Sequence, residues 1–441
     1  MELFVTVPHA IVLVPLERLK PNKANARTHA KRQIADLARS IRQFGWTSPI
    51  LADEDCNILA GHARFEAAQQ LELRHVPVVT LSGLSDAEKR ALALADNKIA
   101  SKAGWDRSLL ALELSELSIL LPEMGLDISL TGFEPFELDM LVTDAAELGS
   151  ADADAIPETA AAAVSHRGDI WKLGNHRLLC GDAQSAGDFE SLMGGSSAAM
   201  VITDPPYNVR IASVQGRGRI KHRNFGQAAG EMSDEQFTQF LRTTIALLIE
   251  HSSLGSIHYL FMDWKHIGEL LAAAKALYDE WKNLVVWNKT NAGQGSFYRS
   301  QHELLCVFKN GTAPHVNNFE LGQNGRTRSN VWTYAGVNTF RAGRLDELKL
   351  HPTVKPVALV ADAMRDCSRR GDLILDPFIG SGTSIIAAES VGRVAYGMEL
   401  DPLYVDVAIR RWQKFTGRDA IVHGGDKVGH RSAGEMLVRA A

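Results

Sequence analysis

The stretch that decides the fold covers residues 373–399 and reads LILDPFIGSGTSIIAAESVGRVAYGME. It starts with an apolar strand, Leu373–Leu375, which leads into a glycine-rich turn and then into a helix over Ser384–Ser390. Gly392 ends that helix, and Val394–Met398 forms the next strand. These elements predict a β-α-β unit, and therefore an α/β domain with a parallel sheet.

The turn in this unit has the composition of a nucleoside-binding loop. It carries Gly380 and Gly382 without a third glycine, and Asp376 precedes it, which argues against a pyrophosphate dinucleotide. Glu399 stands at the end of the second strand, roughly 20 residues after the turn, where an acid can hold ribose hydroxyls. We therefore predict a nucleoside ligand whose amino acid portion crosses the loop.

A second apolar run, Ala198–Ile202, leads directly into Thr203-Asp204-Pro205-Pro206-Tyr207. The run predicts a buried parallel strand, which has to end at the two prolines because proline cannot donate to a β ladder. Asp204 is then expected at the carboxyl edge of the sheet, where open α/β proteins bind ligands. Its carboxylate and the Pro205 carbonyl form a rigid pair of acceptors beside the ring of Tyr207, which suits the exocyclic amino group of a flat base. A simple Asp-Pro turn is the alternative.

Length and composition narrow the class of protein. The chain has 441 residues, enough for two or three domains, and a net charge of -5, so DNA contacts have to come from local basic patches. No apolar stretch reaches the roughly 20 residues of a membrane span, and the N-terminus shows no signal-peptide pattern. The four cysteines match no zinc spacing, so we expect a cytoplasmic, nucleoid-associated protein without a metal site.

Two segments carry local positive charge. The chain is basic and free of acids between Tyr207 and Phe225, and the irregular segment 311–350 combines arginines with aromatic residues. Charge of one sign beside a strand end favours phosphate binding, and aromatics with arginines suit bases, although a small packed subdomain would also explain residues 311–350. The predicted DNA contacts are Arg210, Arg217, Arg219, Lys221, Arg223, Arg299, Arg326 and Arg328.

The first part of the chain, residues 1–143, alternates strand and helix signals. Helical spacing covers Gln33–Phe44, a hairpin is predicted over residues 49–60, and Gly61-His62-Ala63-Arg64 opens a second helix. A glycine and an arginine at a helix start can hold a phosphate, but a tight turn with an exposed arginine explains the same residues. A capping box at Ser85 starts a third helix, and Arg107–Leu121 is a fourth.

Residues 144–166 are predicted to form a flexible linker, because they are rich in alanine and aspartate and hold few large apolar groups. The second domain is predicted over residues 167–420, with its insert at about 311–350. The last residues, 421–441, are expected to form a disordered tail.

The second half resembles the amino-group DNA methyltransferases that use S-adenosylmethionine (AdoMet). Asp204-Pro205-Pro206-Tyr207 matches their catalytic motif, and Phe378-x-Gly380-x-Gly382 matches their cofactor loop. His351–Pro356 matches the segment that closes the cofactor pocket, and Phe297–Glu303 matches the region lining the target-base pocket. Because the catalytic motif comes first, the order is that of the permuted β class. The resemblance implies a Rossmann-like AdoMet-dependent methyltransferase domain.

The resemblance also implies residue roles. Asp204 and the Pro205 carbonyl would accept the amino hydrogens of a base flipped out of double-stranded DNA, and Tyr207 would stack on that base. Gly380 and Gly382 would let the backbone approach AdoMet closely. The implied cofactor contacts are Asp182, Lys355, Asp376, Phe378, Gly380, Gly382, Thr383 and Glu399, with a plain turn as the competing explanation for Asp182. Transfer is a direct displacement that requires no metal, and a homodimer is compatible with the sequence.

The first hundred residues resemble the ParB/sulfiredoxin-like domains, a small α+β fold. The matching residues include Pro21-Asn22, Asn25, Arg27, the first helix and Ala60–Arg64. In that superfamily the loop corresponding to Gly61–Arg64 handles nucleotide or DNA phosphate. Partition proteins usually have Gly-Glu-Arg-Arg there and sulfiredoxins a cysteine, so we expect neither CTP hydrolysis nor sulfinic acid reduction.

Methyl transfer to N6 of adenine is therefore the predicted function, and N4 of cytosine is the closest alternative. Aspartate rather than serine at position 204 favours adenine without deciding between the two bases. A DNA-binding or partition protein would explain the first domain but not the motifs of the second half. Protein-glutamine and RNA methyltransferases share the fold, but the glutamine enzymes usually have asparagine at the position of Asp204.

Overall fold

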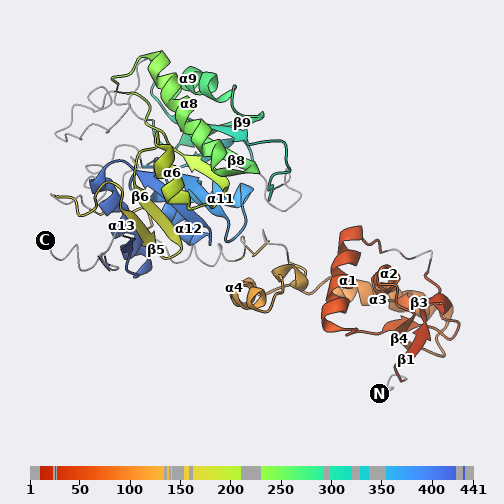
Figure 1. Cartoon of the computed structure of the whole chain (residues 1–441). Helices are drawn as coiled ribbons and strands as arrows, with labels where there is room; N and C mark the ends of the chain where they lie inside the picture. The colour runs from red at the N-terminus through yellow and green to blue at the C-terminus, as the bar shows by residue number, and fades with distance from the viewer. Residues whose placement is uncertain are drawn as a thin grey trace. The chain divides into compact units, whose positions relative to one another are not determined.

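The structure, a computed structural model, describes residues 10–22, 25, 27–133, 137–138, 141, 153–157, 162–209, 230–292, 297–319, 328–336, 354–423 and 431–432. The chain divides into two compact units, Met1–Ala145 and Ala146–Ala441. The first unit begins in red and the second ends in blue in Figure 1. Within the described ranges, no helix is long and apolar enough to cross a membrane.

The first unit is built on a four-stranded sheet with the order β1-β4-β2-β3. The strands are β1 Val12–Pro15, β2 Ile50–Ala52, β3 Ile58–Ala60 and β4 His75–Thr80. β2 runs parallel to β4, whereas β1 pairs antiparallel with β4 and β3 pairs antiparallel with β2. Ile50, Phe65 and Val78 belong to the buried cluster of this unit. The predicted small α+β domain is confirmed.

All four predicted helices of the first unit are present. They are α1 Lys31–Phe44, α2 His62–Gln70, α3 Asp86–Ala100 and α4 Arg107–Glu123. α3 has the predicted capping box, since the Ser85 backbone N–H donates to the Glu88 carboxylate at 2.8 Å. Gly61 precedes α2 with a φ of 103°, and Arg64 donates to the Ser48 carbonyl at 3.1 Å. Arg64 therefore helps to hold this turn together.

The second unit contains an eleven-stranded sheet with the order β11-β9-β10-β8-β7-β12-β13-β6-β5-β14-β15. The run β8-β7-β12-β13-β6 is parallel throughout. The strands are β5 Ile170–Leu173, β6 His176–Cys180, β7 Ala198–Thr203, β8 Ser252–Met262, β9 Glu280–Lys289, β10 His302–Lys309, β11 Val331–Tyr334, β12 Leu373–Asp376, β13 Val394–Glu399, β14 Ile421–His423 and β15 Arg431–Ser432. The predicted α/β domain with a parallel core is confirmed.

Helices cover both faces of this sheet, as a parallel sheet requires (Figure 1). Met200 and Ile202 of β7 belong to a cluster with α11, α12 and α13, whereas the intervening Val201 packs with α6 and α8. The helices are α6 Ala186–Met193, α8 Asp234–Glu250, α9 Ile267–Ala274, α11 Val357–Cys367, α12 Thr383–Ser390 and α13 Pro402–Thr416. The period of two along β7 therefore separates the two layers.

The strand order creates a switch point between β7 and β12. After β7 the chain continues on one side with β8, whereas after β12 it continues on the other side with β13. Open α/β sheets bind ligands beside the carboxyl ends of the strands at such a point. Asp204, Asp376 and Glu399 lie at or directly after the carboxyl ends of β7, β12 and β13. The fold therefore brings them to one edge.

The described residues of the predicted linker pack on the second unit, so this part of the prediction is corrected. Asp154 Oδ1 accepts a hydrogen bond from the backbone N–H of Val357, the first residue of α11, at 3.0 Å. Ile156 is buried and packs with Val354 and Val407. Two specific contacts outweigh the low apolar content of the segment. The second unit accordingly begins near Ala146 rather than at residue 167.

Other boundaries also differ from the predictions. β14 lies within the predicted tail and extends the sheet by pairing with β5. β11 lies within the predicted insert, pairs parallel with β9 and carries the buried Trp332. α11 and α13 were not predicted separately; eight of the eleven residues of α11 are buried.

The contacts of residues 153–165 lead to a prediction about fragments. The free energy of unfolding of a fragment of residues 146–441 should exceed that of a fragment of residues 167–441 by about 2–5 kcal/mol. The shorter fragment loses a helix cap and leaves a buried carboxylate without its hydrogen-bond donors. That carboxylate, Asp406, accepts from the backbone N–H groups of Val164 and Ser165 at 2.7 and 3.1 Å. Urea unfolding of both fragments would measure the difference, and equal midpoints would contradict it.

Candidate active site

Asp204 follows the last residue of β7 and uses both carboxylate oxygens. The Tyr207 hydroxyl donates to Oδ1 at 2.5 Å, and the Lys355 ammonium donates to Oδ2 at 2.5 Å. Pro205 is buried and Pro206 partly buried, which fixes the chain at the strand end. The structure therefore brings the predicted catalytic residues together, with Lys355 among them.

Lys355, predicted as a cofactor contact, lies between two carboxylates. Its ammonium is 3.1 Å from the Glu303 carboxylate as well as 2.5 Å from Asp204, and its side chain is 6% exposed. The ammonium also lies 4.9 Å from the centre of the Phe261 ring. Burial alone lowers the pKa of Lys355, but the charges of Asp204 and Glu303 raise it above its ordinary value. Lys355 is thus a buried cation beside the catalytic motif.

Glu303 and Lys289 complete this cluster and were missing from the predicted site residues. Glu303 forms an ion pair with Lys289, and burial would raise its pKa. The charges of Lys355 and Lys289 outweigh burial and hold the pKa of Glu303 at about 2. Glu303 lies opposite Trp287 in the β9–β10 pair, so Lys289 is its diagonal neighbour. Pairing the two strands by register would have found Lys289.

The cluster also sets the protonation of Asp204 and Tyr207. Burial raises the pKa of Asp204, and the charge of Lys355 opposes that rise. Burial and the two carboxylates raise the pKa of Tyr207 well above its ordinary value. Tyr207 therefore stays protonated and acts as a hydrogen-bond donor to Asp204. With Asp204 ionised, two carboxylates and two ammonium groups balance each other in charge.

Asp376 connects the end of β7 to the glycine-rich turn. Its Oδ1 accepts from the Thr203 hydroxyl at 2.7 Å and from the Phe378 backbone N–H at 3.2 Å, while its Oδ2 accepts from the Ser384 hydroxyl at 2.5 Å. Burial raises the pKa of Asp376 to about 6 despite these hydrogen bonds. Asp376 therefore fixes the turn against the catalytic strand, in addition to its predicted role at the cofactor.

Glu399 holds the turn from the other side. Its Oε2 accepts from the Gly380 backbone N–H at 3.1 Å, and its Oε1 accepts from the Asp401 backbone N–H at 2.9 Å. Burial raises the pKa of Glu399 to about 7, and these hydrogen bonds oppose the rise. Phe378 packs against Phe240 with ring centres 5.9 Å apart. The predicted pair of glycine turn and acid is therefore assembled at one sheet edge.

Gly382 and Thr383 face helix α13, which gives a reason for this glycine besides the predicted approach to AdoMet. Gly382 has a φ of 85°, and an added Cβ would lie 2.9 Å from the Ala408 Cβ. The Thr383 hydroxyl accepts from the buried Arg411 guanidinium at 3.0 Å. The packing of α12 on α13 is therefore a close approach that requires glycine at position 382.

Asp182 follows the end of β6, beside the end of β13. The neighbouring Gly181 N–H donates to the Glu399 carbonyl at 3.0 Å. The Asp182 Oδ1 accepts from the Gln184 backbone N–H at 2.9 Å, which is the turn geometry of the competing explanation. Its position beside Glu399 agrees with the cofactor-binding prediction as well.

Six of the predicted DNA contacts lie outside the described residues: Arg210, Arg217, Arg219, Lys221, Arg223 and Arg326. The two ends of the segment that carries the first five meet at Asn208, which has a φ of 52°. Asn208 donates to the Met232 carbonyl at 2.9 Å and accepts from the Gly230 N–H at 3.2 Å. The described residues on either side of this segment therefore meet beside Tyr207. Arg299 is exposed.

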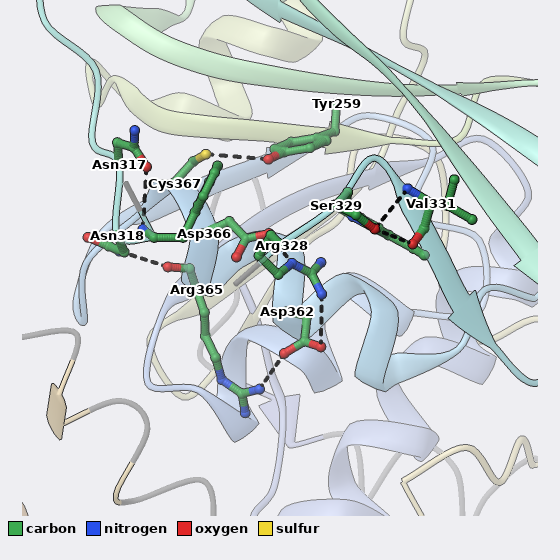
Figure 2. Close-up of polar contacts among 12 residues, drawn as sticks. Tyr259, Asn317, Asn318, Arg328, Ser329, Val331, Asp362, Arg365, Asp366 and Cys367 are labelled. Atoms are coloured by element: carbon green, nitrogen blue, oxygen red, sulfur yellow. Dashed lines mark hydrogen bonds and ion pairs between the residues drawn. The ribbon is translucent and has the colours of Figure 1, made fainter. Parts of the chain in front are cut away.

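Arg328 was predicted to contact DNA, and the structure gives it an internal role instead. Figure 2 shows its guanidinium between Asp362 and Asp366 of α11, at 3.7 and 3.0 Å. The guanidinium also lies 4.3 Å from the centre of the Trp332 ring. Its side chain is 15% exposed. Arg328 therefore anchors the segment before β11 to α11 and is withdrawn as a DNA contact.

Comparisons with known proteins place three families along the chain. Residues 198–410 match the family described as DNA methylase, and residues 6–98 match the ParB N-terminal domain. Residues 108–167 match the ParB-methyltransferase HTH domain. This region includes most of the predicted helix Arg107–Leu121 and the predicted linker.

Individual relatives cover each half. The ParB-like nuclease domain-containing protein YnaK of Escherichia coli is 52% identical over 80 residues, which are 18% of this chain and 92% of that protein. The type II methyltransferase M.HpaI of Haemophilus parainfluenzae is 25% identical over 268 residues, 56% of this chain and 77% of that protein. A crystal structure of an M1.HpyAVI–SAM complex has a TM-score of 0.37 and 18% identity, covering 53% of this chain and 98% of the other.

Proposed function

Because the chain belongs to the DNA methylase family and carries a ParB N-terminal domain, we propose that it methylates N6 of an adenine flipped out of double-stranded DNA, with AdoMet as methyl donor. One observation carries the proposal. The amino acceptor Asp204 and the glycine turn held by Glu399 lie at one sheet edge, joined through the Thr203–Asp376 hydrogen bond.

The turn and its acid suit the cofactor. Glu399 is a partly buried carboxylate at a strand end, which would accept hydrogen bonds from ribose hydroxyls. The Gly380 turn would carry the methionine portion, with Phe378 and Asp376 beside it. When bound, AdoMet would supply the electrophilic methyl group.

The catalytic motif would then act on the base. The exocyclic nitrogen is a poor nucleophile because its lone pair is delocalised into the ring. Asp204 and the Pro205 carbonyl would accept the two amino hydrogens and so favour a pyramidal nitrogen, while Tyr207 would stack on the ring. The nitrogen would take the methyl group that bound AdoMet supplies, and the amino group would give up one proton. Asp204, whose pKa burial raises, is the acceptor for that proton.

The choice of adenine over cytosine rests on aspartate at position 204 and is tested directly. DNA from cells that express the chain should contain N6-methyladenine in one sequence context when modified bases are identified by direct sequencing. If the DNA contains N4-methylcytosine instead, the protein methylates cytosine and not adenine. Unmodified DNA in cells that contain the folded protein would contradict the proposed activity.

The basic segment after Tyr207 is proposed to hold backbone phosphates. Replacing Arg217, Arg219 and Lys221 together with glutamine should weaken binding to all duplexes alike, and the salt slope should become shallower by about one unit per lost contact. Binding titrations on two unrelated duplexes at several salt concentrations would measure both effects. A change in the methylated sequence would instead mean that the segment reads bases.

Residues 1–145 are proposed to act as a second DNA-binding module. The matches to a ParB N-terminal domain and a ParB-methyltransferase HTH domain support this role. A tethered module raises the local concentration of DNA at the active site without changing the chemistry. The module would therefore affect apparent DNA affinity rather than the rate of transfer.

A further inference from the structure

The contacts of Asp204 create a competition that the proposed reaction has to resolve. Oδ2 accepts from the Lys355 ammonium and Oδ1 from the Tyr207 hydroxyl, so each oxygen already has one donor, and an oxygen paired with a cation is a weaker acceptor for a second donor. An amino group that enters the site needs one of them as its acceptor. Of the two donors, the ammonium resembles the amino group more closely, since both present several N–H bonds from one nitrogen.

We propose that Lys355 holds the place of the target amino group on Asp204 and withdraws to Glu303 when the base enters. This inference rests on the proposed function, because it assigns Asp204 to the base. Lys355 is thereby a positioning residue for the catalytic carboxylate. Glu303 is the second partner that makes its withdrawal feasible.

Glu303 is suited to receive the ammonium. It already lies 3.1 Å from the Lys355 nitrogen, so losing Asp204 would not leave the buried charge unpaired. An unpaired buried ammonium would cost several kcal/mol. Lys289 pairs with the opposite oxygen of Glu303, which keeps that carboxylate ionised and in place. The exchange therefore occurs within one charge-balanced cluster.

The backbone around Lys355 is fixed on both sides, so the exchange needs only side-chain movement. Val354 packs on Ile156, and the N–H of Val357 donates to Asp154 at 3.0 Å. A cation at this position is disfavoured by the positive end of the α11 dipole. The carboxylates of Asp204 and Glu303, rather than the helix, therefore stabilise the ammonium, which can pair with either of them.

The inference is tested by removing one carboxylate and then the cation. In Glu303→Gln, Lys355 has Asp204 as its remaining carboxylate and should block it, so the initial rate of methyl transfer should fall roughly 30-fold, as when one partner of a buried charge pair is lost. The double variant Glu303→Gln with Lys355→Met frees Asp204 and should recover roughly tenfold or more of that loss. AdoMet affinity by calorimetry should be unchanged in both variants. Purified full-length protein, labelled AdoMet and unmethylated plasmid DNA suffice.

A pH profile gives a second readout that a merely structural role would not change. Asp204 faces Tyr207, Lys355 and Glu303, with Lys289 behind Glu303 and Asp376 on the next strand. In Lys355→Met the charge that lowers the pKa of Asp204 is absent, while burial and Glu303 still raise it. As the pH falls, this variant should therefore lose its activity at a higher pH than the wild type does.

Glu280→Gln is the matched control, because Glu280 also pairs with a lysine, Lys282 at 3.0 Å, but is 48% exposed. Its transfer rate should equal that of the wild type. A Glu303→Gln rate equal to the wild type, or a double variant no faster than Glu303→Gln, would overturn the inference while the proposed function stands. A wild-type protein that binds AdoMet but labels no DNA would overturn the proposed function itself, and the inference with it.

Discussion

Replacing Asp204 with alanine is expected to abolish methyl transfer while AdoMet affinity stays unchanged. The variant loses the acceptor that polarises the amino group, which should lower the rate by about 10³-fold, the upper range for one preorganised transition-state contact. The fold should persist, because Thr203 and Asp376 still join the two strand ends and Lys355 keeps Glu303 as its partner. Transfer of labelled methyl groups and calorimetric AdoMet binding would measure the two effects separately.

Asp263→Ala is a suitable control for this variant. Asp263 also follows the carboxyl end of a parallel strand, β8, but its carboxylate accepts from the backbone N–H groups of Lys265 and His266 at 3.1 and 2.9 Å. Its loss should lower stability by about 1 kcal/mol through the lost turn contacts and leave transfer intact. An Asp204→Ala protein that keeps a near-normal rate would remove Asp204 from the mechanism.

Gly382→Ala is expected to destabilise the second unit far more than Gly371→Ala. The two glycines have nearly the same backbone, with φ of 85° and 82°, so both substitutions carry the left-handed penalty of about 1–2 kcal/mol. At Gly382 the new Cβ would also lie 2.9 Å from the Ala408 Cβ, whereas at Gly371 nothing lies within 4 Å. The overlap should add about 1–3 kcal/mol.

Urea unfolding monitored by circular dichroism would compare the two variants. If the Gly382 requirement came from the cofactor instead, Gly382→Ala would weaken AdoMet binding at an unchanged midpoint of unfolding. Equal destabilisation by both substitutions would show that α13 yields to the added methyl group.

The strand ends that build the site were predictable because local signals define them. An apolar run that stops at Pro205 and another that stops at a glycine turn predict two parallel strands with acids at their ends. The capping box at Ser85 is equally local, and it is confirmed. The strand and turn positions followed from the residues themselves, and the family resemblance added the roles of the acids.

The contacts of Lys355 were not predictable in the same way. Its partners Asp204 and Glu303 come from β7 and β10, and the sequence gives no strand order that would place them beside one another. The sequence predicts Arg328 as a DNA contact because arginines together with aromatic residues suit phosphates and bases. Two acids of α11, which the sequence reasoning had not recognised as a helix, hold it internally.

The linker prediction was wrong for its described residues for a related reason. Composition counts large apolar groups, and residues 153–157 have few of them. A single carboxylate at Asp154 and a single buried side chain at Ile156 nevertheless fix the segment to α11 and α13. Contacts of this kind depend on the position of one residue, so the average composition of the segment does not predict them.

The most direct measurement follows the methyl group from cofactor to base. Purified full-length protein is incubated with methyl-labelled AdoMet and unmethylated plasmid DNA, and the DNA is then digested to nucleosides and separated. The label should elute with N6-methyldeoxyadenosine and should be absent when the Asp204→Ala protein is used. Label that elutes with N4-methyldeoxycytidine, or DNA that stays unlabelled although the protein binds AdoMet, would contradict methyl transfer to adenine.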